Sequence, residues 1–180
     1  MKFTPFLLLL LPVILLCACN TASNSDRDVT NDYVIITTAI RTSKASRLQF
    51  QEKIAVALDS FLVKDEAMVD INGINQLLQT AAQENLKAIA LVEAANEIDS
   101  SLLYKAKALG MFKLMDEQYK TVYPAIVSTM TGTTKNKKDS IGKLLVPAIE
   151  ALRVLAKDVI NTAAAVVKKY DIKLVEMANP

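Results

Sequence analysis

The chain has 180 residues, of which 52% are hydrophobic, and its 21 basic side chains nearly balance its 19 acidic ones. It contains no histidine, four glycines and two cysteines. The lack of histidine excludes Ser-His and Cys-His catalysis and most zinc sites, and the near-neutral charge argues against nucleic-acid binding. The scarcity of glycine argues against a many-turned all-β fold.

Residues 1–18 have the layout of a secretory signal peptide. Met1 and Lys2 form a short basic start, and an almost unbroken apolar run follows from Phe6 to Leu16. A transmembrane helix needs about 20 apolar residues, whereas this run is shorter and contains Pro12. We therefore expect the segment to be removed, either by ordinary signal cleavage or by cleavage at the cysteines that follow it, with a retained anchor helix as the alternative.

The stretch Leu16-Cys17-Ala18-Cys19 resembles the lipobox of bacterial lipoproteins, in which an apolar residue and small residues precede the acylated cysteine. The resemblance implies a diacylglyceryl thioether on Cys19, cleavage between Ala18 and Cys19, and Cys19 as the mature N-terminus. Cys17 departs from the usual Ser, Ala or Thr, and a second frame would acylate Cys17 itself. A disulfide between the two cysteines would close a ring too tight for ordinary geometry.

The same resemblance implies two or three acyl chains, which anchor a protein persistently, whereas one chain binds reversibly. Asn20 stands where an aspartate retains many lipoproteins in the inner membrane. In a Gram-negative host this favours the outer membrane, with the domain facing the periplasm. After Cys19, the polar stretch to Asp32 has few side chains to bury, so residues 19–32 are expected to be a lipidated N-terminus and a flexible tether.

Apolar spacing predicts the first two helices of the domain. A first helix is indicated from Ile36 to Phe61; the run Val34 to Thr38 also has strand character, but no second convincing strand is available to pair with it. Asn72 and Gly73 mark a turn, and the apolar pattern after it, from Ile74 to Val92, predicts a second helix.

Two further helices are predicted by apolar residues spaced alternately by four and three. The third helix runs from about Ser101 into the 120s, and either Asp99 or Ser100 caps it or the second helix continues into it. Thr131 to Ser140 is expected to be a loop, with Asp139 or Ser140 capping the last helix. The two faces, which should pack together, are Ala108, Phe112, Met115, Tyr119, Val122 and Ile126, and Ile141, Leu145, Ala148, Leu152, Leu155, Val159, Thr162 and Val166.

Pro124 and Pro147 fall inside these two patterns, and a proline inside a helix removes one backbone hydrogen bond and kinks or stops the helix. The predicted fold is therefore all-α. Residues 33–180 are expected to form a single antiparallel bundle of about four helices, two of them kinked at Pro124 and Pro147.

Candidates for chemistry are few. Asp116 with Glu117, or Glu93 with Glu97, could serve as acid and base, although helix surfaces carry such residues routinely. A calcium-like stretch at Asp70 to Gln79 lacks two decisive ligands. We therefore predict no enzyme, no metal and no cofactor.

Other side chains could contribute to binding. Lys135 to Lys138, with Lys168 and Lys169, could attract phosphates or lipid head groups, or could form a solvated surface. The methionines could line an adaptable pocket and the tyrosines could edge a groove, or both could fill the core. These residues are Met111, Met115, Met130, Tyr104, Tyr119, Tyr123 and Tyr170.

The leading functional hypothesis is a non-enzymatic envelope lipoprotein whose helical bundle binds another protein in the periplasm or at the cell surface. The alternative is a bundle that carries or senses a lipid or another small apolar ligand. A third hypothesis is an envelope enzyme that uses carboxylates alone, with Asp116 and Glu117 as the reacting groups.

Overall fold

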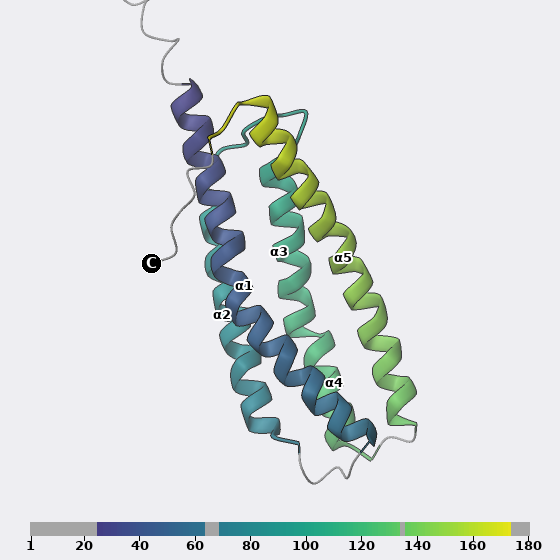
Figure 1. Ribbon diagram of the computed structural model, residues 1–180. Coiled ribbons are helices and arrows are strands. Elements are labelled where there is room, and N and C mark those ends of the chain that lie inside the picture. Colours follow the sequence, from purple (N-terminus) through teal and green to yellow (C-terminus); the bar gives the residue numbers. More distant parts are fainter. Residues whose placement is uncertain (1–24, 64–68, 134–135, 174–180) are drawn as a thin grey trace, which may run out of the picture.

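The computed structural model describes residues 25–63, 69–133 and 136–173, and within these ranges it contains helices and no strand. The helices are α1 (Ser25–Val63), α2 (Ile71–Ala94), α3 (Tyr104–Lys120), α4 (Val122–Thr131) and α5 (Lys137–Lys169). Because α4 follows α3 after one residue and continues along the same line, the helices form four antiparallel rods (Figure 1). The predicted all-α antiparallel bundle is confirmed.

The core lies where the predicted apolar faces meet. On α3 and α4, Ala108, Phe112 and Ile126 are fully buried, and on α5, Ile141, Val159 and Val166 are buried opposite them. The rods that carry these two faces pack on each other, as predicted. The segment Val34 to Thr38 is helical and belongs to α1, so its strand character is overridden by the packing of Ile36 in the core.

Aromatic rings link α1 to the α3–α4 rod. Phe50 of α1 meets Tyr119 edge-on with ring centroids 6.1 Å apart, and it meets Tyr123 in the same way at 4.7 Å. Nearer the start of α1, Tyr33 stacks on Tyr104 at 5.8 Å. Edge-to-face and offset rings contribute about 0.5–1.5 kcal/mol per pair beyond their buried area. These contacts hold α1 against the rod at two levels.

The structure differs from the sequence prediction in the second half of the expected tether. Helix α1 begins at Ser25, so the part of the expected tether from Ser25 to Asp32 is helical, and the bundle begins before Tyr33. The polar character of this stretch is misleading because Asp32 is buried and its carboxylate accepts hydrogen bonds from the backbone and side chain of Asn96. Residues 19–24 lie outside the described part of the chain.

The two prolines have different consequences. The α3–α4 rod is interrupted at Thr121, whose φ of −122° and ψ of −58° leave the helical range. Pro124 has no N–H to donate to the carbonyl of Lys120, which explains a break at this level. By contrast, α5 continues as one helix through Pro147.

The sequence predicts the buried faces of the helices more accurately than the residues at which the helices begin. Helix α5 begins at Lys137, directly after Asn136, which has a φ of 57°, so Asp139 and Ser140 lie in its first turn instead of capping it. Helices α2 and α3 are not continuous. Leu103 precedes α3 in the left-handed region, with a φ of 57°, and neither Asp99 nor Ser100 caps that helix.

Candidate functional site

The α1–α5 edge is the weakly packed side of the bundle. Helix α1 packs on α2, and α5 packs on α3 and α4, whereas α1 and α5 barely touch. In Figure 1 the α3–α4 rod is visible between the ribbons of α1 and α5. Side chains do not fill this edge completely, because two hollows lie along it. We call the two hollows together the α1–α5 groove.

The larger hollow lies at the start of α5 and has a volume of about 740 Å³. Leu58 of α1 forms one side, and the first three turns of α5 form the other. Its lining is mainly apolar and is open to solvent. The α5 residues that line it are Lys138, Asp139, Ile141, Gly142, Lys143, Leu145, Val146 and Pro147.

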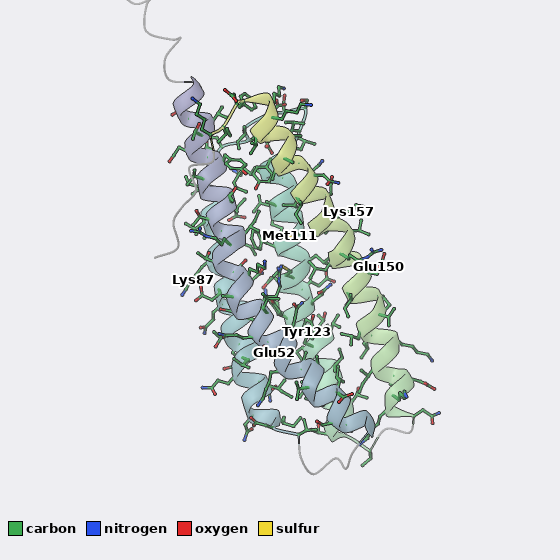
Figure 2. All side chains as sticks on the ribbon, viewed as in Figure 1. Glu52, Lys87, Met111, Tyr123, Glu150 and Lys157 are labelled. Carbon is green, nitrogen blue, oxygen red and sulfur yellow. The ribbon has the colours of Figure 1, made fainter. Side chains whose placement is uncertain are left out.

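The second hollow lies at the middle of the groove and has a volume of about 240 Å³. It combines hydrogen-bond donors with an apolar wall. Tyr123 of α4 lines it, and Figure 2 shows this side chain between the ribbons of α1 and α5. The other lining residues are Arg47, Gln51, Ile149, Leu152, Arg153 and Ala156.

Arg47 is a partly buried cation in this second hollow. Its Nη1 donates to the sulfur of Met115 at 3.6 Å, and no carboxylate of the described residues lies within ion-pair distance of it. Burial raises the pKa of the Tyr119 and Tyr123 phenols, and the charge of Arg47 opposes that shift at both. The guanidinium therefore acts electrostatically on two tyrosines in the core.

A row of α5 side chains borders the groove. Val146 is 65% exposed and Ile149 is 52% exposed, and both line the groove. Ile160, 68% exposed, continues the row at helical spacing. These residues lie beside the predicted core face, not on it. Sequence reasoning missed them, although their presence outside the four-and-three pattern is the signal that could have found them.

The predicted carboxylate pairs are not brought together as an acid–base site. Glu97 accepts from the backbone N–H groups of Lys105 and Ala106 at 3.0 Å each, so it caps α3. Asp116 forms an ion pair with Lys120 at 2.6 Å. Glu93 and Glu117 are exposed on their helix surfaces. These four residues therefore have structural or surface positions.

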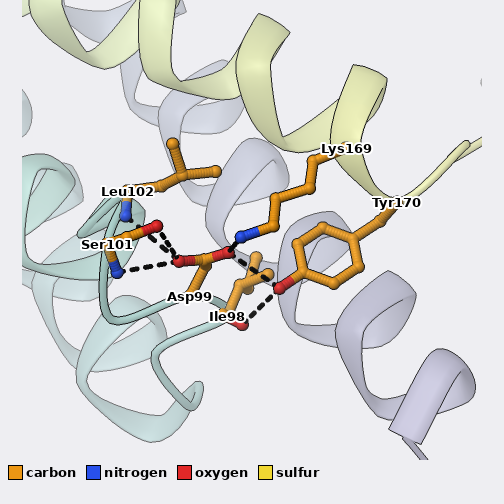
Figure 3. Close-up of polar contacts among 6 residues, drawn as sticks. All are labelled: Ile98, Asp99, Ser101, Leu102, Lys169 and Tyr170. Atoms are coloured by element: carbon orange, nitrogen blue, oxygen red, sulfur yellow. Dashed lines mark hydrogen bonds and ion pairs between the residues drawn. The ribbon is translucent and has the colours of Figure 1, made fainter.

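The most connected polar cluster also has a structural role (Figure 3). Asp99 accepts from the backbone N–H and hydroxyl of Ser101, and from Lys169 and Tyr170 of the α5 end. The bond from Lys169 is the first cause that holds the pKa of this carboxyl below its ordinary value. Its bonds fasten α5 to the α2–α3 connection.

The remaining candidates divide between core and surface. Met111, Met115 and Met130 are buried, as are Tyr104, Tyr119 and Tyr123, so they fill the core, and Tyr123 also lines the groove. Asp70 caps α2 through the N–H of Gly73 at 2.9 Å and pairs with Lys53. Lys137 lies over the ring of Phe61. Among the residues that the structure describes, no group of acidic or cysteine side chains is arranged to hold a metal ion.

The predicted anchor falls outside the described residues, since Ala18 and Cys19 precede Ser25, where the described part of the chain begins. Between residues 25 and 173, omitting 64–68 and 134–135, no helix combines the length and the apolar character needed to cross a membrane. Searches of protein-family models, curated proteins and solved structures find no match to this chain.

Proposed function

We propose that this chain is a non-enzymatic lipoprotein of the bacterial envelope, anchored through Cys19, whose α1–α5 groove binds a helix of another protein. The observation that carries the proposal is the unpacked edge between α1 and α5, with its row of exposed apolar residues on α5. In a closed four-helix bundle this edge would be filled by contacts between the two helices. Here the same apolar surface is available to a partner.

The shape of the groove favours a helix over a small ligand. The lining on α5 runs from Lys138 to Ala156, a rise of about 27 Å at 1.5 Å per residue. An amphipathic helix can lie along such a trough with its apolar face inward. A site for a small apolar ligand normally encloses most of its ligand, whereas this groove is open. Protein binding is therefore preferred over the lipid-carrier alternative.

The anchor gives the groove its proposed place in the cell. Cys19 with its acyl chains would hold the chain at a membrane, and Asn20 favours the outer membrane with the bundle in the periplasm. Intact mass of the membrane-extracted full chain tests this part. A mature chain that begins at an acylated Cys19, and that is lost in Cys19→Ala, is expected; an unmodified chain that still carries Met1 would refute the anchor.

Site-specific photo-cross-linking in the bacterium that carries the chain tests the groove. A cross-linking side chain is placed at Ile149, which lines the groove, or at Val154, which is 58% exposed and lies about 140° around the same helix. We expect one discrete heterologous adduct from position 149 and none from position 154. Adducts of equal strength at both positions, or an adduct only with a second copy of the chain, would refute the proposal.

A further inference from the structure

The charged residues that line the groove are mostly basic. Lys138, Lys143, Arg47 and Arg153 line its two hollows, and Asp139 is the single acidic residue among the lining residues. Arg153 is already paired with Glu150 at 2.8 Å. The lysines are exposed and solvated, so Arg47 is the cation of the groove whose charge is least compensated.

An unpaired, partly buried guanidinium is costly in a free protein. Desolvation weakens its interaction with water, and a thioether sulfur replaces only a small part of what is lost. Gln51 and Tyr123 line the same hollow, and an amide and a phenol can both donate to an oxyanion. A carboxylate placed there would compensate the charge and accept several hydrogen bonds.

We propose that the partner helix is acidic, and that one of its carboxylates enters the middle hollow of the α1–α5 groove and pairs with Arg47. This inference rests on the proposed function and specifies the chemistry of the partner. Apolar side chains on the same face of the partner helix contact Ile149 and Leu152 and continue into the larger hollow around Val146. The lysines at the start of α5 attract the acidic helix and set its orientation along the groove.

Three designed peptides of about 18 residues, enough for five helical turns, test this inference. They share one apolar face and differ at a single central position at the edge of that face, which is Glu, Gln or Lys. Binding is measured by fluorescence anisotropy with the full chain in lipid nanodiscs, against empty nanodiscs. We expect the Glu peptide to bind about tenfold or more tightly than the Gln peptide, and the Lys peptide to bind weakest.

Substitutions of Arg47 test whether this residue causes the preference for the Glu peptide. Arg47→Met keeps the length of the side chain and should abolish the preference for Glu over Gln, while Arg47→Lys should keep part of it. Lys157→Met is the matched control, because Lys157 is an exposed cation that does not line the groove. The preference should remain unchanged in this variant.

The outcomes separate the two proposals. Equal affinity of the native chain for the Glu and Gln peptides would overturn the acidic partner and leave the groove function standing. Failure of all three peptides to bind would overturn both. Native mass spectrometry with oleate adds a third arm: stoichiometric retention of oleate that is lost in Arg47→Met, without any peptide binding, would assign the groove to an anionic amphiphile and overturn the protein partner.

Discussion

Lys169 and Asp99, 70 residues apart in the chain, form an ion pair that fastens the last turn of α5 to the connection between α2 and α3. The side chain of Asp99 is only 6% exposed, and Tyr170 donates to the same carboxylate oxygen at 2.9 Å. This carboxylate therefore joins the end of α5 to the α2–α3 connection, two segments that are far apart in the sequence.

The ion pair predicts an acid-sensitive contribution to stability. The pKa of the Asp99 carboxyl lies below its ordinary value of 3.8, first because of the bond from Lys169 and then because of those from Ser101. A carboxyl whose pKa is lowered by folding stabilises the native state above its unfolded pKa, and this contribution is lost as the pH falls through the lowered value. The melting temperature of the chain should therefore decline below about pH 4.

Asp99→Asn should melt several degrees below the native chain at pH 7. The difference should narrow as the pH falls below about 4, because the Asp99 carboxyl of the unfolded chain then takes up a proton while that of the folded chain stays ionised. Calorimetry between pH 7 and pH 2.5 measures both melting temperatures. Asp59→Asn is the control, since Asp59 is exposed. A difference between Asp99→Asn and the native chain that stays constant over the whole range would contradict the assignment.

Leu103 predicts a stabilising substitution. Its φ of 57° and ψ of 41° lie in the left-handed region, which costs a non-glycine residue about 1–2 kcal/mol. Its side chain is 45% exposed, so little buried area is lost on removal. Part of the gain is offset by the greater freedom of glycine in the unfolded chain. Leu103→Gly should therefore raise the free energy of unfolding by about 0.5–1 kcal/mol.

Urea unfolding of two adjacent variants tests this difference. Leu102 packs against the core and has no positive φ, so Leu102→Gly should destabilise the chain by about 2 kcal/mol or more. Opposite signs for neighbouring leucines would be hard to produce by any general effect of glycine. If Leu103→Gly also destabilises the chain, the left-handed backbone at this position carries no strain worth relieving.

Pro147 predicts a second stabilising change. Inside α5 it cannot donate to the carbonyl of Lys143, and its ring crowds that carbonyl, at a cost of about 3 kcal/mol in an ordinary helix. Pro147→Ala should therefore raise the free energy of unfolding by at least about 1 kcal/mol. Pro124→Ala, in the first turn of α4, should have a smaller effect because an N–H there has less to bond with. A larger gain at Pro124 would reverse this ranking.

Helix faces could be predicted from the sequence, whereas helix ends could not. Val159 and Val166 are buried because the four-and-three spacing places them on one side of α5, which is a local property. In the first turns of α1, which begins at Ser25, the buried Asp32 binds Asn96 from 64 residues away, a contact that no local sequence pattern indicates. Helix α5 begins after Asn136, whose backbone is left-handed and whose side chain makes no capping hydrogen bond. The usual sequence signals for a capping residue therefore did not indicate this position.

The groove was less predictable than the core. Which edge of a bundle stays unpacked depends on the angles between helices, and the spacing within each helix does not determine these angles. Tyr123 was a candidate for a groove edge, and the structure places it there. Arg47 ends an almost wholly polar stretch of α1, residues 41–47, so its position in a hollow beside Met115 could be found only from the packing.

Arg47 predicts a conflict between stability and binding. A residue that serves binding is often unfavourable for the stability of the free protein. Its replacement then stabilises the fold and weakens the binding of the partner. Arg47→Met retains most of the packing of the side chain and removes a partly buried charge that has no carboxylate partner among the described residues. We expect the free energy of unfolding of Arg47→Met to rise by about 1 kcal/mol, and urea unfolding measures it.

The control is Lys157→Met, at an exposed position, whose free energy of unfolding should stay within about 0.5 kcal/mol of that of the native chain. A loss of more than about 1 kcal/mol in Arg47→Met would instead make Arg47 a residue that holds α1 to the α3–α4 rod, because only a favourable contact in the free protein could be lost by that substitution.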